Sequence, residues 1–409
     1  MKSNYKPIGV YIRLVDERNV GLKVTTLLGL SISKKFIPSV ANTIGSDMEN
    51  YKIIRKNQFA CSLMQVRRDK KIPVALLQYF EEAIISQAYP VFEVIDEDAL
   101  LPEYLMMWFS RSEFDRESCF YAVGGVRGSL EWEDFCNMQL PIPSLEKQKE
   151  IVAEYNIIVD RIKLNEQLNQ KLEETAQAIY KQWFVDFEFP DEKGKPYRAS
   201  GGEMEYEPKI EFDIPLGWSC TELKELVEHD SPITYGVVKP GPQDENGVLF
   251  IRGGDIKSGF ITVSELRTIT NDVSRQYNRT KLNGGELIVS LVGNPGAVAI
   301  VPFSLKDANI ARQVALVRIR KDFGTIYTLY YLTSRAGQDR LRNETSGSVQ
   351  QVINLEDLRM VKILVPDSKT LNTFNSVGQE LFNLLEGKRH ENERLRTLMQ
   401  ILLSKQSAG

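Results

Sequence analysis

Two long stretches of the chain have seams at alternating steps of four and three, with apolar residues at the ends and polar residues in the middle. This spacing is typical of coiled coils. In the first stretch the positions are Ile151, Tyr155, Ile158, Ile162, Asn165, Asn169, Leu172, Ala176, Ile179 and Trp183. In the second they are Phe374, Gly378, Leu381, Leu385, Lys388, Asn392, Leu395, Met399 and Leu402. The sequence therefore predicts two long helices, over residues 144–189 and 367–409.

The two predicted helices belong to a repeat with an offset of 223 residues. WEDF at 132–135 falls on LEDL at 355–358, and QLPIP at 139–143 falls on KILVP at 362–366 without a gap. Each proline is followed by a polar residue suited to cap a helix, Ser144 in one copy and Asp367 in the other. The repeat thus predicts a short strand, a cap and a long helix, twice.

A seam sustained over several heptads needs a partner, so we expect the two helices to pack on each other antiparallel. The central Asn169 and Asn392 would set the register at some cost in stability. The predicted pairing residues are Ile158, Ile162, Asn169, Leu172, Leu381, Leu385, Asn392 and Leu395. The alternative is two unrelated surface helices, each on its own domain.

The segments outside the helices combine β-branched tracts, bounded by Gly, Pro and Asn, with short helical stretches. The tracts lie at 248–252, 286–290, 298–301 and 314–319, and the short helices at 102–109 and 325–332. We predict an α+β fold: two mixed, strand-rich domains separated by two long antiparallel helices that form a coiled-coil spacer with pseudo-two-fold symmetry. The predicted boundaries are 1–143 (first domain), 144–189 (central helix), 190–215 (acidic linker), 216–366 (second domain) and 367–409 (C-terminal helix).

The overall charge conceals opposed regions. The 409 residues carry a formal charge of -4, which by itself argues against a nucleic-acid binder. However, residues 1–71 hold 14 Lys and Arg against 5 Asp and Glu, residues 72–143 hold 3 against 13, and residues 250–320 hold 10 against 5. Because phosphate binding needs local positive surface, we interpret the basic clusters as candidate DNA contacts, with ordinary solvated charge as the alternative. The candidates are Lys34, Lys35, Arg55, Arg67, Arg68, Lys70, Arg252, Arg275, Arg279, Lys281 and Arg312, together with Gln350, whose amide could instead stabilise a turn.

Candidate catalytic chemistry is sparse. The two histidines and four cysteines have no partners at metal-ligand or triad spacing. The glycine-rich segments at 253–259 and 293–296 lack the order of a phosphate loop or a methyltransferase motif and are interpreted as turns. The apolar stretch at 287–303 is interrupted at Asn294 and Pro295, and the first residues lack the apolar core of a signal peptide. We therefore expect a cytoplasmic, non-membrane protein without a catalytic or metal site.

Four segments carry a family resemblance: LPIPSLEKQKEI at 140–151, AIYKQWFVDF at 178–187, GKPYRASGGE at 194–203 and PLGW at 215–218. Together with two heads that alternate with two helices, they resemble the specificity subunit of type I restriction-modification systems. One departure is that the first head begins with YKPIG at 5–9 and lacks a Pro-x-Gly-Trp opening.

The resemblance implies a division of labour. Each head would be a target-recognition domain that reads one half of a bipartite, asymmetric double-stranded DNA site. The helices would set the spacer and dock two methylation subunits, which use S-adenosylmethionine to methylate adenine. Restriction subunits, which use ATP with magnesium, would complete the complex, and this chain would hold no cofactor. Two alternatives stay open: a stand-alone DNA methyltransferase or endonuclease, and a coiled-coil protein adaptor without DNA binding.

Overall fold

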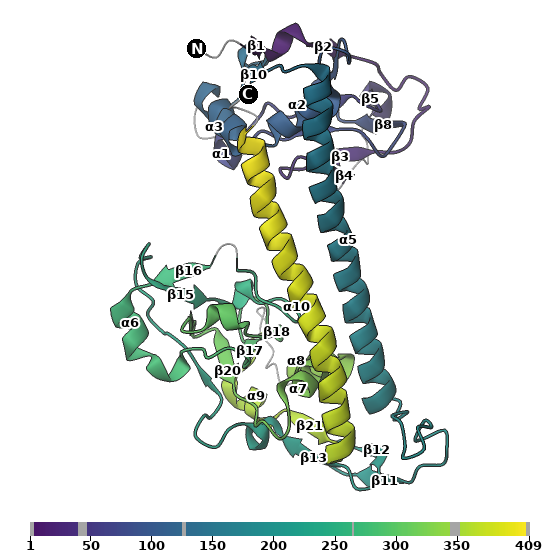
Figure 1. The fold of residues 1–409 in the computed structure, drawn as a ribbon, viewed down its shortest axis with the longest axis vertical. Helices are drawn as coiled ribbons and strands as arrows, with labels where there is room; N and C mark the ends of the chain where they lie inside the picture. Colours follow the sequence, from purple (N-terminus) through teal and green to yellow (C-terminus); the bar gives the residue numbers. More distant parts are fainter. Residues whose placement is uncertain (1–3, 40–46, 125–127, 264–265, 344–351, 406–409) are drawn as a thin grey trace. The chain divides into compact units, whose positions relative to one another are not determined.

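The computed structural model describes residues 4–39, 47–124, 128–263, 266–343 and 352–405. The chain divides into two compact units: unit 1 holds residues 1–166 and 389–409, and unit 2 holds residues 167–388. Each unit combines a strand-rich head with part of each of the two long helices, α5 (Leu145–Phe184) and α10 (Ser368–Lys405) (Figure 1).

The head of unit 1 lies between the chain start and α5. Its strands are β1 (Tyr5–Pro7), β2 (Ile12–Val15), β3 (Leu28–Leu30), β4 (Phe36–Pro38), β5 (Lys52–Arg55), β6 (Phe59–Cys61), β7 (Val74–Leu76), β8 (Glu82–Ile85), β9 (Val91–Val94) and β10 (Gln139–Pro141). Its helices are α1 (Val66–Asp69), α2 (Pro102–Phe109), α3 (Ser112–Tyr121) and α4 (Trp132–Asn137), with 3-10 turns η1 (Ile8–Val10) and η2 (Met48–Asn50).

The head of unit 2 lies between α5 and α10. Its strands are β11 (Met204–Glu207), β12 (Phe212–Pro215), β13 (Ser219–Glu222), β14 (Thr234–Tyr235), β15 (Val248–Ile251), β16 (Arg267–Ile269), β17 (Leu287–Ser290), β18 (Val298–Ile300), β19 (Asn309–Ile310), β20 (Val314–Val317) and β21 (Lys362–Val365). Its helices are α6 (Asn271–Gln276), α7 (Thr325–Thr333), α8 (Arg335–Asn343) and α9 (Leu355–Met360), with 3-10 turns η3 (Leu223–Leu226), η4 (Gly253–Asp255), η5 (Asn278–Thr280) and η6 (Phe303–Leu305).

The two heads contain the same antiparallel four-stranded sheet. Its strand order is β2-β9-β6-β7 in unit 1 and β14-β20-β17-β18 in unit 2. In each head, an early strand pairs with the strand that precedes α5 or α10: β1 pairs with β10, and β13 pairs with β21. The segment at 5–9 that opens the first head is therefore the counterpart of the strand that follows Trp218.

The 223-residue repeat extends further upstream than the segments at 132–143 and 355–366, in which the sequence shows it. β9 and β20 begin at 91 and 314, α2 and α7 at 102 and 325, α3 and α8 at 112 and 335, and α4 and α9 at 132 and 355. Side-chain bonds repeat with it: Tyr104 donates its hydroxyl to the carbonyl of Pro141 (3.2 Å), and Tyr327 donates to that of Leu364 (2.7 Å). A gap-free frame from the central strand to the long helix thus occurs twice.

The predicted α+β fold with two strand-rich heads and two long helices is confirmed. Both helices begin one residue after the predicted caps, at Leu145 and Ser368. The predicted extension of the first helix to residue 189 is wrong, since α5 ends at Phe184. Phe187 then adopts a left-handed backbone conformation (φ 59°), and Phe187 and Phe189 fold onto the ring of Trp218. Burial of these rings outweighs continuation of the helix.

Candidate nucleic-acid interface

Two hairpin loops occupy the same place in the two four-stranded sheets. In unit 1 the 62–73 loop joins β6 to β7, and in unit 2 the 291–297 loop joins β17 to β18. The two loops differ in content: residues 62–73 include four cations and one anion, whereas residues 291–297 include no charged residue. The frame therefore presents two different loops from one equivalent position.

A basic surface on unit 1 surrounds its loop. We define the unit 1 basic surface as the exposed cations Lys35, Arg67, Arg68, Lys70 and Lys71. Arg67 donates from Nη1 to the carbonyl of Gly124 (3.2 Å), and Arg68 forms an ion pair with Asp69 (2.6 Å). For Lys35, Lys70 and Lys71 no ion pair is found within the described part of the chain. Four of the predicted contacts (Lys35, Arg67, Arg68 and Lys70) thus come together.

Lys34 does not belong to this surface, because its side chain is only 9% exposed. Its ammonium group lies 2.8 Å from Asp115 and also bonds to the carbonyl of Phe109. Burial lowers the pKa of Lys34, and the Asp115 carboxylate opposes that shift. Lys34 is therefore buried with an ion-pair partner, and this placement does not favour the predicted contact with DNA.

Arg55 lies at the other end of β6 from the basic surface. It forms ion pairs with Glu17 (2.7 Å) and Glu82 (2.7 Å), and its hydrogen bond with Glu17 raises the pKa of Arg55 and lowers that of Glu17. Two carboxylates neutralise one guanidinium at this place. The cluster of cations in the sequence predicts more positive charge at Arg55 than the folded chain has there, because the ion pairs offset it.

The cations predicted on unit 2 are also divided. Arg312 lies two residues before β20, whereas Arg318, which follows β20, donates to the carbonyls of Arg279 and Lys281. At about 3.3 Å per residue, the two groups lie roughly 20 Å apart at opposite ends of the strand. The structure therefore does not bring Arg279 and Lys281 together with Arg312.

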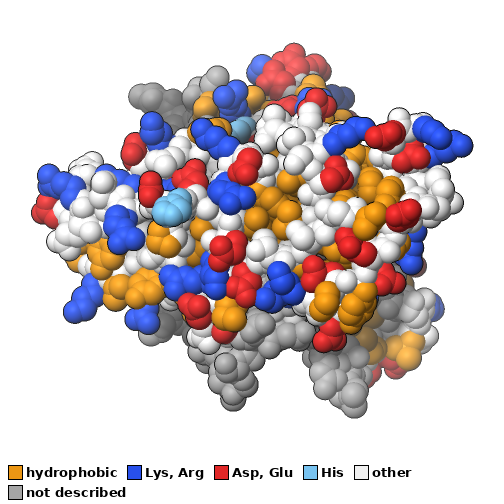
Figure 2. All heavy atoms as spheres, turned by 90° about the horizontal axis from the view of Figure 1, so that it is seen from below, with side chains coloured by type: hydrophobic (Ala, Val, Ile, Leu, Met, Phe, Trp, Pro, Cys, Tyr) orange, Lys and Arg blue, Asp and Glu red, His pale blue; other side chains and the backbone are white. Residues whose placement is uncertain are grey.

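The remaining unit 2 predictions have mixed outcomes. Arg252 follows β15 and forms an ion pair with Asp255 (2.8 Å). It lies close to the 291–297 loop, since the next residue, Gly253, packs against the carbonyl of Val292. Arg275 pairs with Asp272 on α6, and Gln350 lies outside the described residues. Figure 2 shows one face of the molecule, on which Lys and Arg alternate with Asp and Glu without a continuous field of one sign.

The seam predicted for the long helices is inside the helix pair. Every predicted seam position is buried or half-buried, and Ile158, Ala176, Phe374 and Leu385 are buried. Within unit 2, Tyr180 of α5 contacts Phe374 near the start of α10, and Leu172 lies beside Leu384 further along. The contacts move from Tyr180 to Leu172 along α5 while they move from Phe374 to Leu384 along α10, so the two helices are antiparallel.

The register asparagines need one correction. Asn392 accepts a hydrogen bond from Asn165 (2.9 Å), not from the predicted Asn169, and both partners are buried in unit 1. Ion pairs flank them, Arg161 with Glu391 (2.6 Å) and Arg396 with Glu166 (2.8 Å). Asn169 is the repeat counterpart of Asn392, and its Oδ1 is buried without a hydrogen bond among the described residues.

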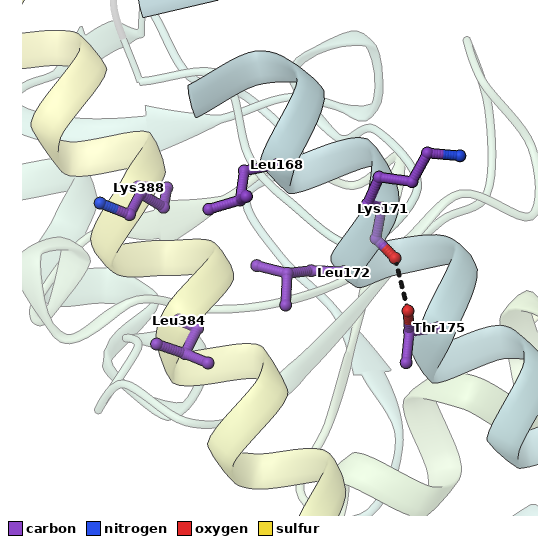
Figure 3. A pocket seen from close by; sticks show the side chains of 6 residues that line it. All are labelled: Leu168, Lys171, Leu172, Thr175, Leu384 and Lys388. Carbon is purple, nitrogen blue, oxygen red and sulfur yellow. Dashed lines mark hydrogen bonds between the residues drawn. The ribbon is translucent and has the colours of Figure 1, made fainter. Parts of the chain in front are cut away.

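A groove of about 200 Å³ opens between the helices in unit 2 (Figure 3). Leu168, Leu172 and Thr175 of α5 face Leu384 of α10 across it, with Lys171 and Lys388 at its margins. Leu168 and Leu384 are 43% and 54% exposed. They occupy the repeat positions of Glu391 and Arg161, so an apolar groove in unit 2 replaces an ion pair in unit 1.

The described residues contain no cluster of three His, Cys, Asp or Glu side chains that could hold a metal ion. His229 is fully exposed beside Asp230, and His390 contacts Glu393 (3.2 Å). Burial raises the pKa of all four cysteine thiols, which keeps them protonated and unreactive. Among the described residues, no helix is both long and apolar enough to cross a bilayer.

Comparison with known proteins agrees with this architecture. A family model described as the type I restriction modification DNA specificity domain matches residues 45–174. The specificity subunit of the type I restriction enzyme EcoBI from Escherichia coli is 28% identical over 287 residues, which cover 66% of this chain and 58% of that subunit. The chain is therefore similar to the specificity subunits of type I restriction enzymes.

A second specificity subunit is also similar to this chain. It belongs to the type I restriction enzyme MjaIX from Methanocaldococcus jannaschii and is 22% identical over 320 residues, or 76% of this chain and 69% of the relative. The crystal structure of the type I restriction-modification S subunit from M. genitalium aligns over 98% of this chain and 95% of its own, with a TM-score of 0.56 and 12% identity. This last likeness shows a shared fold.

Proposed function

We propose that this chain is a type I specificity subunit that reads a bipartite, asymmetric DNA sequence, with unit 1 reading one half and unit 2 the other. The observation that carries the proposal is the frame that occurs twice with different hairpin loops. A repeated scaffold places two readers in equivalent positions, and different loops let them read different bases. The heads also differ in a further sheet: unit 1 has the two-stranded antiparallel sheet β5-β8, whereas unit 2 has the three-stranded sheet β16-β15-β19, in which β15 and β19 are parallel.

Local charge supports DNA as the ligand in spite of the net charge of -4. The unit 1 basic surface offers unpaired ammonium groups, and cations of this kind bind phosphate and release counterions. Arginine additionally matches the O6 and N7 acceptors of guanine in the major groove. On unit 2, Arg312 is exposed just before β20, and Arg252 lies close to the 291–297 loop in an ion pair with Asp255. The small number of free cations predicts weak binding by the isolated chain.

The helix pair would set the distance between the half-sites. The 40 residues of α5 extend about 60 Å at 1.5 Å per residue, which is close to two turns of B-DNA. The antiparallel seam and the Asn165–Asn392 bond hold the two helices in one register.

Apolar side chains on the outer faces of the helices support docking of further subunits. Ile157, Leu164 and Leu398 of unit 1 and Leu168 and Leu384 of unit 2 are each at least 43% exposed. Exposed apolar side chains mark a protein interaction site where they form a contiguous patch. We expect two methylation subunits to dock there and to supply S-adenosylmethionine and the chemistry. Restriction subunits would bring ATP and magnesium, and the specificity subunit itself would not be catalytic.

The experiment that tests the spacer role lengthens both helices by one heptad in register. Seven residues inserted between Glu166 and Gln167, and seven between Lys388 and Arg389, keep the facing positions matched. Sequencing of methylated adenines in a host that carries the assembled system should reveal a longer spacer between unchanged half-sites. An unchanged spacer would contradict the proposal.

Matched controls isolate the cause. The same seven residues placed after Gly201, in an exposed turn of the linker, should leave the spacer unchanged. Insertion into α5 alone should abolish methylation, because the seam loses register.

The two alternative functions are tested separately. Turnover by the isolated chain with S-adenosylmethionine or magnesium would favour an enzyme. Absence of salt-dependent affinity for duplex DNA in the assembled complex would favour an adaptor.

A further inference from the structure

We propose that the 62–73 loop is the base-reading element of unit 1, that Arg67 contacts a base, and that Asp115 is the positioning residue that holds the loop. In unit 2 the 291–297 loop and Gln338 take the equivalent places. This inference rests on the proposed function, since it specifies which part of unit 1 reads DNA.

The first support is an anchor that recurs at one position of the repeat. Asp115 and Gln338 are each the fourth residue of their helix, α3 and α8. The backbone N–H of Ile72 donates to Oδ1 of Asp115 (3.1 Å), and Nε2 of Gln338 donates to the carbonyl of Gly296 (2.9 Å). Two chemically different side chains thus make the same connection between frame and hairpin loop.

Asp115 connects more than one segment of unit 1. The residue is 8% exposed, and the same Oδ1 that accepts from Ile72 lies 2.8 Å from the ammonium of Lys34. Lys34 belongs to the turn between β3 and β4 and has a left-handed backbone conformation (φ 61°). One buried carboxylate therefore holds the 62–73 loop and the turn that presents Lys35.

Several other bonds hold the loop in place. Backbone N–H groups of Val66 and Leu130 donate to the carbonyls of Gly128 (3.0 Å) and Leu63 (2.9 Å). The stem of Arg67 packs so closely on Gly128 that a Cβ there would lie 2.7 Å from its Cγ. A reading element needs this rigidity, because a side chain that contacts bases must be held in place by supporting bonds.

The exposed side chains of the loop can be assigned by their bonds. Arg68 is held by both carboxylate oxygens of Asp69, at 2.6 and 3.0 Å. Among the described residues, Arg67 donates only from Nη1, to the carbonyl of Gly124, which leaves its other donors for the two acceptors of guanine. Lys70 and Lys71 flank it and suit phosphate. Arg67 is therefore the base contact and the lysines are the backbone contacts.

Methylome sequencing of the assembled system tests Arg67, because it reports each half-site separately. Arg67→Ala should raise methylation at sites that differ at one base of one half-site by roughly 10-fold relative to the correct site, and should leave the other half-site and the spacer unchanged. The matched control Arg55→Ala removes a similarly exposed arginine from the opposite end of β6 and should leave both half-sites unchanged. An unaltered motif in Arg67→Ala would overturn the inference.

A pair of double variants tests Asp115 without leaving an unpaired buried charge. Lys34→Met with Asp115→Asn retains an acceptor for the Ile72 N–H, whereas Lys34→Met with Asp115→Ala removes it. The first should keep the specificity of the unit 1 half-site, and the second should relax it with the other half-site unchanged. Equal specificity in the two, at equal thermal stability, would overturn the positioning role.

Failure of this inference differs from failure of the proposed function. If wild type methylates a bipartite motif and Arg67→Ala methylates the same motif, unit 1 reads DNA through another element and only the inference falls. If wild type in its complex directs no bipartite motif, the proposed function itself falls.

Discussion

Units 1 and 2 share one frame but place their aromatic residues differently. In unit 1, Phe135 lies buried among Phe92, Phe109, Phe114 and Trp132, with ring centroids 5.2 to 6.0 Å away. The corresponding residues in unit 2 are Leu358 among Ala315, Leu332, Gly337 and Leu355. Unit 2 instead gathers Tyr180, Phe184, Trp218, Tyr327 and Phe374 where the two long helices meet the head.

This difference teaches that the frame is specified by bonds and periodicity, not by a fixed set of core side chains. The tyrosine at 104 and 327 keeps its bond to the strand before the long helix in both units. Around it, aromatic and aliphatic residues exchange places as long as the volume is filled. The same tolerance leaves the hairpin loops free to diverge.

The largest expected effect comes from truncation of the equivalent core residues. Phe135→Ala should destabilise unit 1 by about 3–5 kcal/mol, because it removes a ring that four others contact. Leu358→Ala should cost unit 2 about 2–5 kcal/mol. Hydrogen exchange followed peptide by peptide should show lost protection in the mutated unit. A uniform loss over both units in either variant would contradict the view that each unit has its own core.

The register asparagines should respond with opposite signs. Asn392→Leu leaves Asn165 buried without its partner and should cost about 1–3 kcal/mol. Asn169→Leu removes an amide oxygen that is already buried without a hydrogen bond among the described residues, so stability should be unchanged or rise by about 1 kcal/mol. Urea denaturation of the two variants measures the contrast. Equal destabilisation by both would show that Asn169 has an equivalent bonding role.

The groove between the helices in unit 2 can be given the ion pair that unit 1 has at the same repeat positions. Leu168→Glu with Leu384→Arg places in unit 2 the ion pair that Glu391 and Arg161 form in unit 1. An exposed pair of this kind contributes about 0.2–1 kcal/mol, so thermal stability should change little. Affinity for the methylation subunits should fall, because the apolar groove is filled with charge. Unchanged affinity in a titration would indicate that the groove is not a docking surface.

The smallest effect concerns the strands that close each head. Glu222 of β13 lies opposite Lys362 of β21, and Lys224 together with Lys362 lowers the pKa of Glu222 from 4.5 to about 2. The equivalent positions in unit 1, Pro7 of β1 and Gln139 of β10, carry no charge. Because the folded state lowers this pKa, the stabilisation is present above pH 4.5 and is lost as pH falls toward 2. Acid should loosen β13 before β1, and Glu222→Gln should remove the difference. Exchange of strand amides at pH 5 and pH 3 measures it, and equal loosening in wild type would exclude this cause.

Much of the fold could be predicted from sequence because it depends on local pattern. The alternation of four and three predicted every seam position from Ile151 to Leu402, and the proline followed by Ser144 or Asp367 predicted both helix starts within one residue. The offset of 223 could also have been followed upstream to Val91. It aligns Asp115 with Gln338, which was the available signal for the anchors of the hairpin loops.

The interface residues were harder to predict because the carboxylates that pair with the candidate cations lie far from them in sequence. Lys34 and Lys35 are adjacent, yet one is buried against Asp115 and the other is exposed. Arg55 is neutralised by Glu17 and Glu82, which only strand pairing brings together. A run of cations in the sequence therefore shows where Lys and Arg residues occur. It does not show which of their side chains are exposed and which form ion pairs.

The sequence by itself determined the periodicity, the caps, the repeat and hence the two heads with their two long helices, since each depends on residues within a few positions. Only the tertiary structure decided which asparagine pairs with Asn392, which cations remain free, and that one carboxylate holds two segments of unit 1. These outcomes depend on contacts between distant segments. The free energy of such a contact is set by burial and by the partner present, neither of which local pattern contains.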